Sequence, residues 1–228
     1  MIGKGKSISH GVAALEYDLA KEINGQAVAT EIARHELYGC TGAEMVQEMK
    51  PYHIDFPNVK NNCLRFEVSP SIEESATFTD ADWAELGNDF MQRMGLANHQ
   101  YIIIRHSGTE SKKEQAHLHI LANRVSLSGE LYRDNWIGKK ATEAANAIAK
   151  ERNFVQSQDI GKVNKAEIKE AMDGVLKKMQ GFDFTKFKEE LGKRGFKVRE
   201  ARASTGKLNG YYVTARSGTE YKASEIGK

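Results

Sequence analysis

Residues 101–123 decide the fold: Tyr101-Ile-Ile-Ile-Arg-His106, then a polar segment, then His117-Leu-His-Ile-Leu-Ala-Asn123. The first run is β-branched and long enough for a buried strand, and the second alternates between polar and apolar residues. Because successive side chains of a strand point to opposite faces, His117 and His119 share one face and Leu118 takes the other. The polar segment is short enough to bring His106 alongside. The stretch therefore predicts two neighbouring strands with three imidazoles gathered on one face.

Further strands and helices follow from hydrophobic periodicity on either side of this stretch. Because they do not alternate regularly, they favour an α+β fold with a largely antiparallel sheet. The first nine residues, which are small, basic and rich in glycine, are predicted to form a frayed terminus. Strands are predicted at 64–68, 196–200 and 211–214, a turn with a short return strand at 129–132, and helices at 11–23, 83–94, 137–152, 165–179 and 184–194.

The length and composition bound the class of protein. A chain of 228 residues is one large domain or two small ones, and 40% hydrophobic with 28% charged residues is an ordinary globular balance. No apolar run is long enough for a membrane span or placed as a signal peptide, so no membrane insertion is expected. Cys40 and Cys63 are too few for a disulfide framework, which favours a reducing cytoplasm.

The charge is unevenly distributed along the chain. From Glu151 onward there are 17 Lys and Arg against 11 Asp and Glu, or +6, which leaves 16 minus 20, or −4, for residues 1–150. A basic C-terminal third predicts a polyanionic partner such as nucleic acid. The alternative is an ordinary solvated face.

The three clustered histidines are candidate metal ligands. Three of the seven histidines of the chain lie within fourteen positions, at His106, His117 and His119. Three imidazoles leave coordination positions open for substrate, which is typical of a catalytic rather than a structural site. The alternative is a solvent-facing strand with incidental histidines. The sequence alone does not choose between Zn and the Mg or Mn that phosphate ligands favour.

Several segments, in the correct order, resemble the His-hydrophobic-His (HUH) relaxases, endonucleases that nick plasmid and mobile-element DNA at an origin of transfer. Within that class the chain is similar to relaxases of Bacteroides-type mobilisable elements. The likeness spans most of the chain, and because such proteins often continue further, whether this is a truncated nuclease domain stays open. The segments are 1–10 with Tyr17, 64–95 with Phe78-Thr-Asp-Ala-Asp-Trp83, Tyr101–Glu110, His117–Val125 and Gly218–Ile226.

The resemblance implies a relaxase core over residues 1–155, with a central antiparallel sheet of about five strands flanked by helices. Residues 156–228 are then a basic extension of helices and a β-hairpin, packed on the core and contacting DNA. Tyr17 matches the nucleophile, and the three histidines match the ligands of one divalent cation, with Mg or Mn favoured and Zn or Ni possible in a crystal. The family commonly has Asp two residues after the first His, but this chain has Gly108 there. Glu67 and Glu110 are candidates for its role as a base or extra ligand.

The implied reaction is strand-specific cleavage by Tyr17, which leaves a 5′-phosphotyrosine adduct and serves mobilisation. The expected partners are a single-stranded nick site, adjacent duplex or hairpin DNA, and accessory mobilisation and coupling proteins. Three alternatives stay open: a rolling-circle replication initiator with the same metal and tyrosine, a zinc hydrolase that needs no Tyr17, and a DNA-binding module without activity. Candidate phosphate contacts near the motifs are Lys4, Lys6, Arg105, Arg124 and Arg133.

Overall fold

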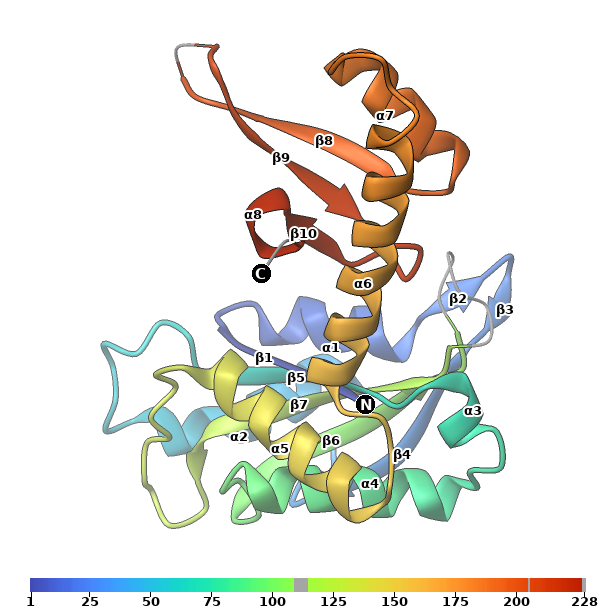
Figure 1. Ribbon diagram of the computed structural model, residues 1–228. Helices are drawn as coiled ribbons and strands as arrows, with labels where there is room; N and C mark the ends of the chain where they lie inside the picture. The colour runs from blue at the N-terminus through green and yellow to red at the C-terminus, as the bar shows by residue number, and fades with distance from the viewer. Residues whose placement is uncertain (109–114, 205, 227–228) are drawn as a thin grey trace. The chain divides into compact units, whose positions relative to one another are not determined.

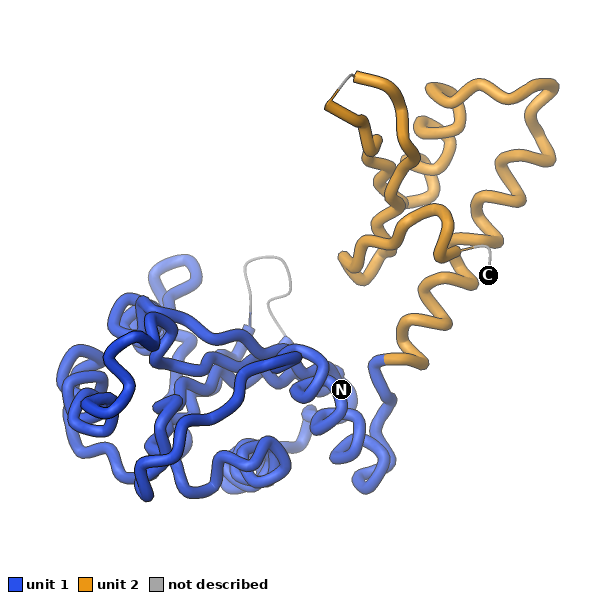
Figure 2. Tube along the Cα trace, turned by 90° about the vertical axis from the view of Figure 1, so that its left-hand side faces the viewer, with its two compact units in different colours: residues 1–157 blue, residues 158–228 orange. Residues whose placement is uncertain are grey.

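The computed structural model describes residues 1–108, 115–204 and 206–226. The chain divides into two compact units, Met1–Ser157 and Gln158–Lys228, each with a hydrophobic core of its own (Figure 2). The division predicted between residues 155 and 156 lies two residues before this boundary. The predicted α+β class is confirmed.

The N-terminal unit is built on a five-stranded sheet in which every neighbouring pair is antiparallel (Figure 1). The strand order is β1-β5-β7-β6-β4, so the two strands of the histidine stretch lie at and beside the centre. This confirms the predicted sheet of about five strands. The strands are β1 (Ile2–Ile8), β4 (Ala29–His35), β5 (Cys63–Ser69), β6 (His99–His106) and β7 (His117–Ser126).

Alternation along the strands divides the apolar residues between two faces. One face, which we call the inner face, is covered by the helices α4 (Asp80–Arg93) and α5 (Ile137–Glu151). Its residues include Phe66, Leu118 and Ile120. The opposite face, which we call the outer face, carries Ile104 and Leu121. These two residues belong to a second cluster that includes residues of α1 (Gly11–Leu19) and α2 (Gly42–Met49). The histidines share the outer face with this second cluster, because they have the same strand parity as Leu121 and Ile104.

The predicted frayed terminus is wrong, because residues 2–8 form the edge strand β1. Met1 is 1% exposed, and Gly3 lies directly against α5. A Cβ atom on Gly3 would come within 2.6 Å of the Ala145 Cβ, closer than real side chains approach. Gly3, which suggests flexibility in the sequence, therefore allows a helix to pack closely on a strand.

The predicted helix 11–23 is too long, since α1 ends at Leu19. Residues 22–27 form a hairpin of two short strands, β2 (Glu22–Ile23) and β3 (Gln26–Ala27). Its turn is Asn24-Gly25, with φ of 53° and 73°, the left-handed pair that a tight hairpin turn requires. Ile23 follows the helical spacing, but this turn overrides it.

Several elements were not predicted or are reduced in the structure. The strand β4 shows no regular alternation, whereas α2 carries two signals that the sequence offered: apolar residues at helical spacing (Met45, Val46 and Met49) and the capping box of Thr41 and Glu44. The expected return strand at 129–132 is a single bridge between Val125 and Leu131. The remaining short elements of this unit are the 3₁₀ helix η1 (Lys50–His53) and the helix α3 (Ile72–Ser75).

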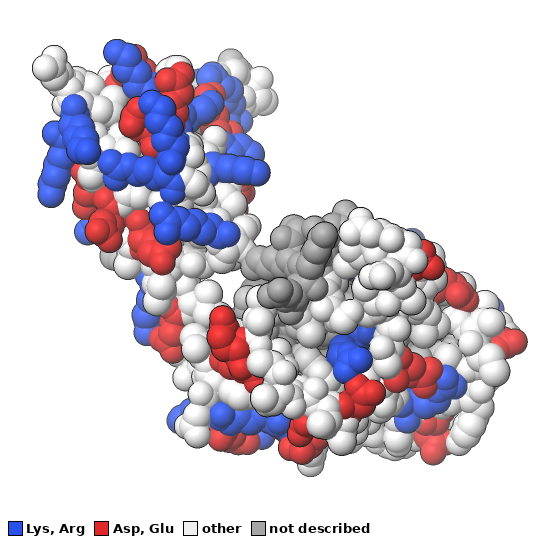
Figure 3. Space-filling model, turned by 90° about the vertical axis from the view of Figure 1, so that its right-hand side faces the viewer, with Lys and Arg blue, Asp and Glu red and all other residues white. Residues whose placement is uncertain are grey.

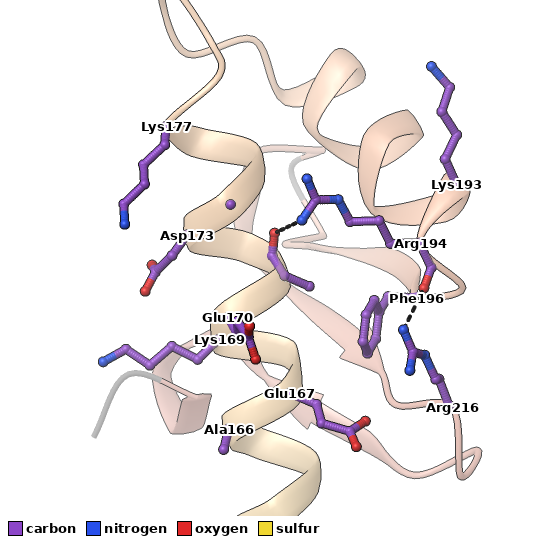
Figure 4. Close-up of a pocket in the computed structure, with 12 residues that line it drawn as sticks. Ala166, Glu167, Lys169, Glu170, Asp173, Lys177, Lys193, Arg194, Phe196 and Arg216 are labelled. Atoms are coloured by element: carbon purple, nitrogen blue, oxygen red, sulfur yellow. Dashed lines mark hydrogen bonds between the residues drawn. The ribbon is translucent and has the colours of Figure 1, made fainter.

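The C-terminal unit combines helices with a three-stranded antiparallel sheet of order β10-β9-β8. Ile168, Phe187, Leu191 and Val213 are among the residues of its core. An open cavity of about 1170 Å³ is lined by α6 (Ser157–Leu176), by Arg194 and Phe196, and by Arg216 from a later turn (Figure 4). The elements are α6 (Ser157–Leu176), α7 (Phe184–Lys193), β8 (Lys197–Arg202), β9 (Leu208–Thr214), β10 (Glu220–Lys222) and α8 (Ala223–Ile226).

Among the described residues, no helix is both long and apolar enough to cross a membrane.

Candidate metal centre

The strand register brings the three predicted histidines together at one end of the outer face. His106 on β6 pairs directly with His117 on β7, and His119 follows two residues along the same face. The imidazole centroids are 4.4 Å apart for His106 and His119, 4.9 Å for His117 and His119, and 5.4 Å for His106 and His117. One nitrogen from each ring lies within 4.8 Å of the others, a group that can hold a single cation.

Hydrogen bonds from His106 and His117 to backbone carbonyls fix which nitrogen of each ring faces the other histidines. His106 Nε2 donates to the Asp18 carbonyl oxygen at 2.7 Å, and His117 Nδ1 donates to the Gln115 carbonyl oxygen at 3.0 Å. Each ring is thereby left with one unprotonated nitrogen, which is the usual arrangement of a metal-binding histidine. His117 Nε2 lies 3.0 Å from His119 Nε2. Two ring nitrogens aimed at each other fit a shared cation, so the donor set suits a divalent metal.

Burial keeps the imidazoles of His106 and His119 in the neutral form that binds metal. His106 is 2% exposed and His117 is 6% exposed. Desolvation lowers the pKa of His106. The pKa of His119 falls to about 2, chiefly by desolvation and further through the nearby His106 and His117. A neutral imidazole can bind a cation without first releasing a proton to solvent.

The sequence reasoning missed two residues that contact the triad, Asp18 and Arg65. Asp18 is 1% exposed, and its Oδ2 accepts a hydrogen bond from Arg65 Nε at 3.0 Å. Its Oδ1 lies 3.7 Å from His119 Nδ1. Burial raises the pKa of the Asp18 carboxyl, and the Arg65 guanidinium offsets part of this effect. The available signal was a carboxylate on the apolar stripe of a helix, three residues after the buried Leu15.

Tyr17 precedes Asp18 on the same helix and faces outward. Its side chain is 56% exposed, as expected from its position off the apolar stripe. The Tyr17 hydroxyl oxygen accepts a hydrogen bond from Lys21 Nζ at 2.8 Å, and the Lys21 ammonium lies 4.9 Å from the ring centroid. The helix therefore carries a tyrosine with a cationic partner one residue from a direct contact to the triad.

Glu67 lies on the same face as His119, its register partner on β7, and it accepts a hydrogen bond from Lys4 Nζ at 2.9 Å. A cavity of about 210 Å³ opens beside these residues and is also bordered by Lys6 and Arg65. Asp18 Oδ1 also lies near His119, and a role of Glu67 as a base or extra ligand stays a prediction. Glu110 lies outside the described residues.

The structure does not bring the three predicted arginines to the triad. Arg105 and Arg124 have the strand parity of the inner face. Arg105 pairs with Asp80, and Arg124 pairs with Asp134 at 2.6 Å. Arg133 is exposed in the loop before α5. A role in DNA contact stays a prediction for all three.

On the five-stranded sheet, the three histidines form a group that can hold a metal ion, and the helix beside them carries an exposed tyrosine. A family model described as relaxase, MobA/VirD2-like, nuclease domain matches residues 17–154, more than half of the chain. The chain belongs to this family and is a DNA-nicking relaxase domain. No curated protein matches it.

Solved structures similar to the chain include three of the conjugative relaxase TrwC in complex with oriT DNA. The metal-free structure is 10% identical with a TM-score of 0.40, and the metal-bound structure is 11% identical with a TM-score of 0.40; each match covers 91% of this chain and 74% of the other. A copper-bound structure is 13% identical with a TM-score of 0.37 and coverages of 91% and 75%. This likeness is remote, and membership of the family rests on the sequence match alone.

Proposed function

We propose that the chain cleaves one DNA strand at an origin of transfer by transesterification, with Tyr17 as the nucleophile. The observation that carries this proposal is the hydrogen bond from His106 to the carbonyl of Asp18. Since Asp18 follows Tyr17 directly, this contact ties the tyrosine helix to the metal-binding face. A tyrosine elsewhere on the surface would not lie next to a residue that is hydrogen-bonded to one of these histidines.

In the proposed step, the Tyr17 hydroxyl loses its proton and its oxygen forms a bond to the scissile phosphorus. The bond from phosphorus to the 3′ oxygen breaks, and that oxygen takes up a proton to become a free 3′-hydroxyl. The 5′-phosphate stays attached to Tyr17, which conserves the ester for later rejoining. The Lys21 ammonium, bonded to the Tyr17 oxygen, stabilises the negative charge that develops there.

His106, His117 and His119 would hold the divalent cation. When bound, it would act as a Lewis acid on the non-bridging phosphate oxygens. Mg²⁺ or Mn²⁺ suits a phosphate-bearing substrate, whereas imidazoles also accept Zn²⁺ or Ni²⁺, so the latter are expected to bind in a crystal. The neutral state of the His106 and His119 rings supports binding near neutral pH.

Two lysines on β1 are proposed to hold the single strand beside the metal. Lys4 and Lys6 are exposed and border the cavity next to His119. Their ammonium groups would bind backbone phosphates, a contact that positions the strand and weakens with salt. Glu67, bonded to Lys4, would orient that lysine.

The C-terminal unit is proposed to bind duplex or hairpin DNA next to the nick. Residues 158–228 carry 16 Lys and Arg against 10 Asp and Glu, or +6. Lys and Arg side chains gather on the face of this unit seen in Figure 3, with acidic side chains between them. On the sheet, the Arg199 guanidinium lies 4.3 Å from the centroid of the Tyr212 ring. We place the reaction in the cytoplasm, with accessory mobilisation and coupling proteins that receive the cleaved strand.

A covalent adduct with single-stranded DNA tests this function. The purified chain is incubated with Mn²⁺ and a random-sequence single-stranded library, and adducts that survive detergent are isolated and sequenced. Wild type is expected to enrich one sequence, while Tyr17→Phe, which removes one oxygen, yields no adduct yet still binds the enriched oligonucleotide. Cleavage by Tyr17→Phe with a free 5′-phosphate product would overturn the proposal in favour of a metal-bound water.

A further inference from the structure

A carboxylate and a guanidinium form an ion pair directly behind the triad. Asp18 is almost completely buried, and the side chain of Arg65 is 20% exposed. Arg65 donates through Nε at 3.0 Å and through a second nitrogen to the other carboxylate oxygen. Because desolvation offsets most of the attraction between buried charges, such a pair adds little net stability. Its position against a candidate metal ligand points to another role.

His119 needs a hydrogen-bond acceptor behind it when it binds a cation. A neutral imidazole carries one ring proton. His119 Nε2 faces His117, so this nitrogen can offer its lone pair to a cation only when the proton is on Nδ1. In the structure, Arg65 donates a hydrogen bond to His119 Nδ1 at 3.3 Å, and Asp18 Oδ1 lies 3.7 Å from the same nitrogen without a hydrogen bond to it. Once the proton is on Nδ1, Arg65 can no longer donate to this nitrogen, and the adjacent Asp18 carboxylate is positioned to accept a hydrogen bond from it.

We infer that Asp18 is a positioning residue for the metal-bound triad, held in place by Arg65. It contacts two of the three histidines by different groups, His106 through its backbone carbonyl and His119 through its carboxylate. The inference rests on the proposed metal site but not on the identity of the nucleophile. Because Asp18 also follows Tyr17, the residue that positions the histidines lies on the helix that carries this tyrosine.

Charge gives the inference a measurable consequence. The Arg65 guanidinium lies against His119 and would repel a cation there, and the Asp18 carboxylate neutralises it. Asp18→Asn removes the negative charge and leaves the buried positive charge unpaired. Loss of such an outer partner typically weakens metal binding about 10- to 100-fold. The double change Asp18→Asn with Arg65→Gln removes both charges, so part of the affinity is expected to return.

Calorimetric titration of the full chain with Zn²⁺ alone tests the inference. Asp18→Asn is expected to bind at least tenfold more weakly than wild type, and the double variant is expected to fall between them. Asp89→Asn is the matched control, because Asp89 accepts from Arg93 at 2.8 Å on α4, away from the histidines, and it should bind as wild type. An affinity of folded Asp18→Asn within threefold of wild type would overturn the inference. If Asp18→Asn does not fold, the double variant Asp18→Asn with Arg65→Gln is measured instead. A Zn²⁺ affinity of this double variant equal to that of wild type would contradict the inference.

Nitrogen-15 NMR of the imidazoles provides a readout that a merely structural role would not move. In the Zn²⁺-loaded wild type, the His119 ring proton is expected on Nδ1. A proton on Nε2 would show that His119 binds through the nitrogen that faces Asp18, and would contradict the inference. Neither measurement uses DNA, so failure of Asp18 to position the triad and failure of Tyr17 to form an adduct are distinguishable.

Discussion

The two faces of the five-stranded sheet are made from the same strands but differ in the side chains that they carry. The inner face is apolar across its centre, from Phe66 through Leu118 to Ile103, under α4 and α5. The outer face combines core residues with a polar site: Leu121 pairs with Arg65 on β5, and Ile104 on β6 pairs with His119. Within β7, two residues therefore separate a side chain that holds the fold from one that is proposed to hold a metal.

This difference shows how the fold supports a polar centre. A buried imidazole or carboxylate is costly unless it is bonded, and each of His106, His117 and Asp18 has a partner. The apolar inner face contributes hydrophobic stability. One end of the outer face can therefore carry polar groups that contribute little to the free energy of unfolding. Changes to neighbouring residues on opposite faces should therefore affect different properties.

The largest effect is expected from His119→Ala on the outer face. Removal of one of three imidazole ligands should weaken Mn²⁺ or Zn²⁺ binding by more than about 100-fold and abolish adduct formation. Calorimetry and the adduct assay measure both quantities, with circular dichroism as the check on folding. Retained affinity in both His117→Ala and His119→Ala would rule the triad out as the metal site.

Leu118→Ala, one residue away, should produce the opposite pattern. Leu118 is fully buried on the inner face. Its truncation should lower the free energy of unfolding by about 2–5 kcal/mol through lost burial and a residual cavity. Urea denaturation measures this loss, and Zn²⁺ affinity of the folded variant should equal that of wild type. A large loss of metal affinity without a loss of stability would erase the contrast between the faces.

Removal of residues 158–228 should have a moderate effect confined to DNA binding. The deletion takes away a net charge of +6, so duplex affinity should fall and its dependence on salt should flatten. Cleavage of a short single strand should change less, because the triad and Tyr17 lie in the N-terminal unit. Fluorescence anisotropy across a salt series compares the two chains, and equal slopes would remove the proposed role of this unit.

The smallest effect is expected from alkylation of the two cysteines, which differ in exposure. Cys63 lies on the apolar part of the outer face, and burial raises the pKa of its thiol to about 11. Cys40 is exposed. Because the thiolate is the reactive form, iodoacetamide at pH 8 should label one thiol per folded chain, at Cys40, and two after unfolding. Mass spectrometry of the labelled peptides checks this, and rapid labelling of Cys63 would show that this part of the face is open.

The sequence predicted what depends on local pattern. Alternation placed His117 and His119 on one face, and the short connection placed His106 beside them, as the register shows. Predictions failed where a distant partner decides the outcome. Gly3 forms an ordered strand because α5 packs against it, and Asp18 reaches the histidines only because α1 lies on the outer face. Neither contact is encoded by spacing along the chain.

The residue that carries the DNA tests the account most directly. After adduct formation with the enriched oligonucleotide and nuclease trimming, trypsin should release residues 7–21 as one peptide that contains Tyr17. Fragmentation should place the nucleotide mass on Tyr17, and only when Mn²⁺ is present during the reaction. A nucleotide on another residue, such as the exposed Tyr38, or an adduct that forms equally without metal, would contradict it.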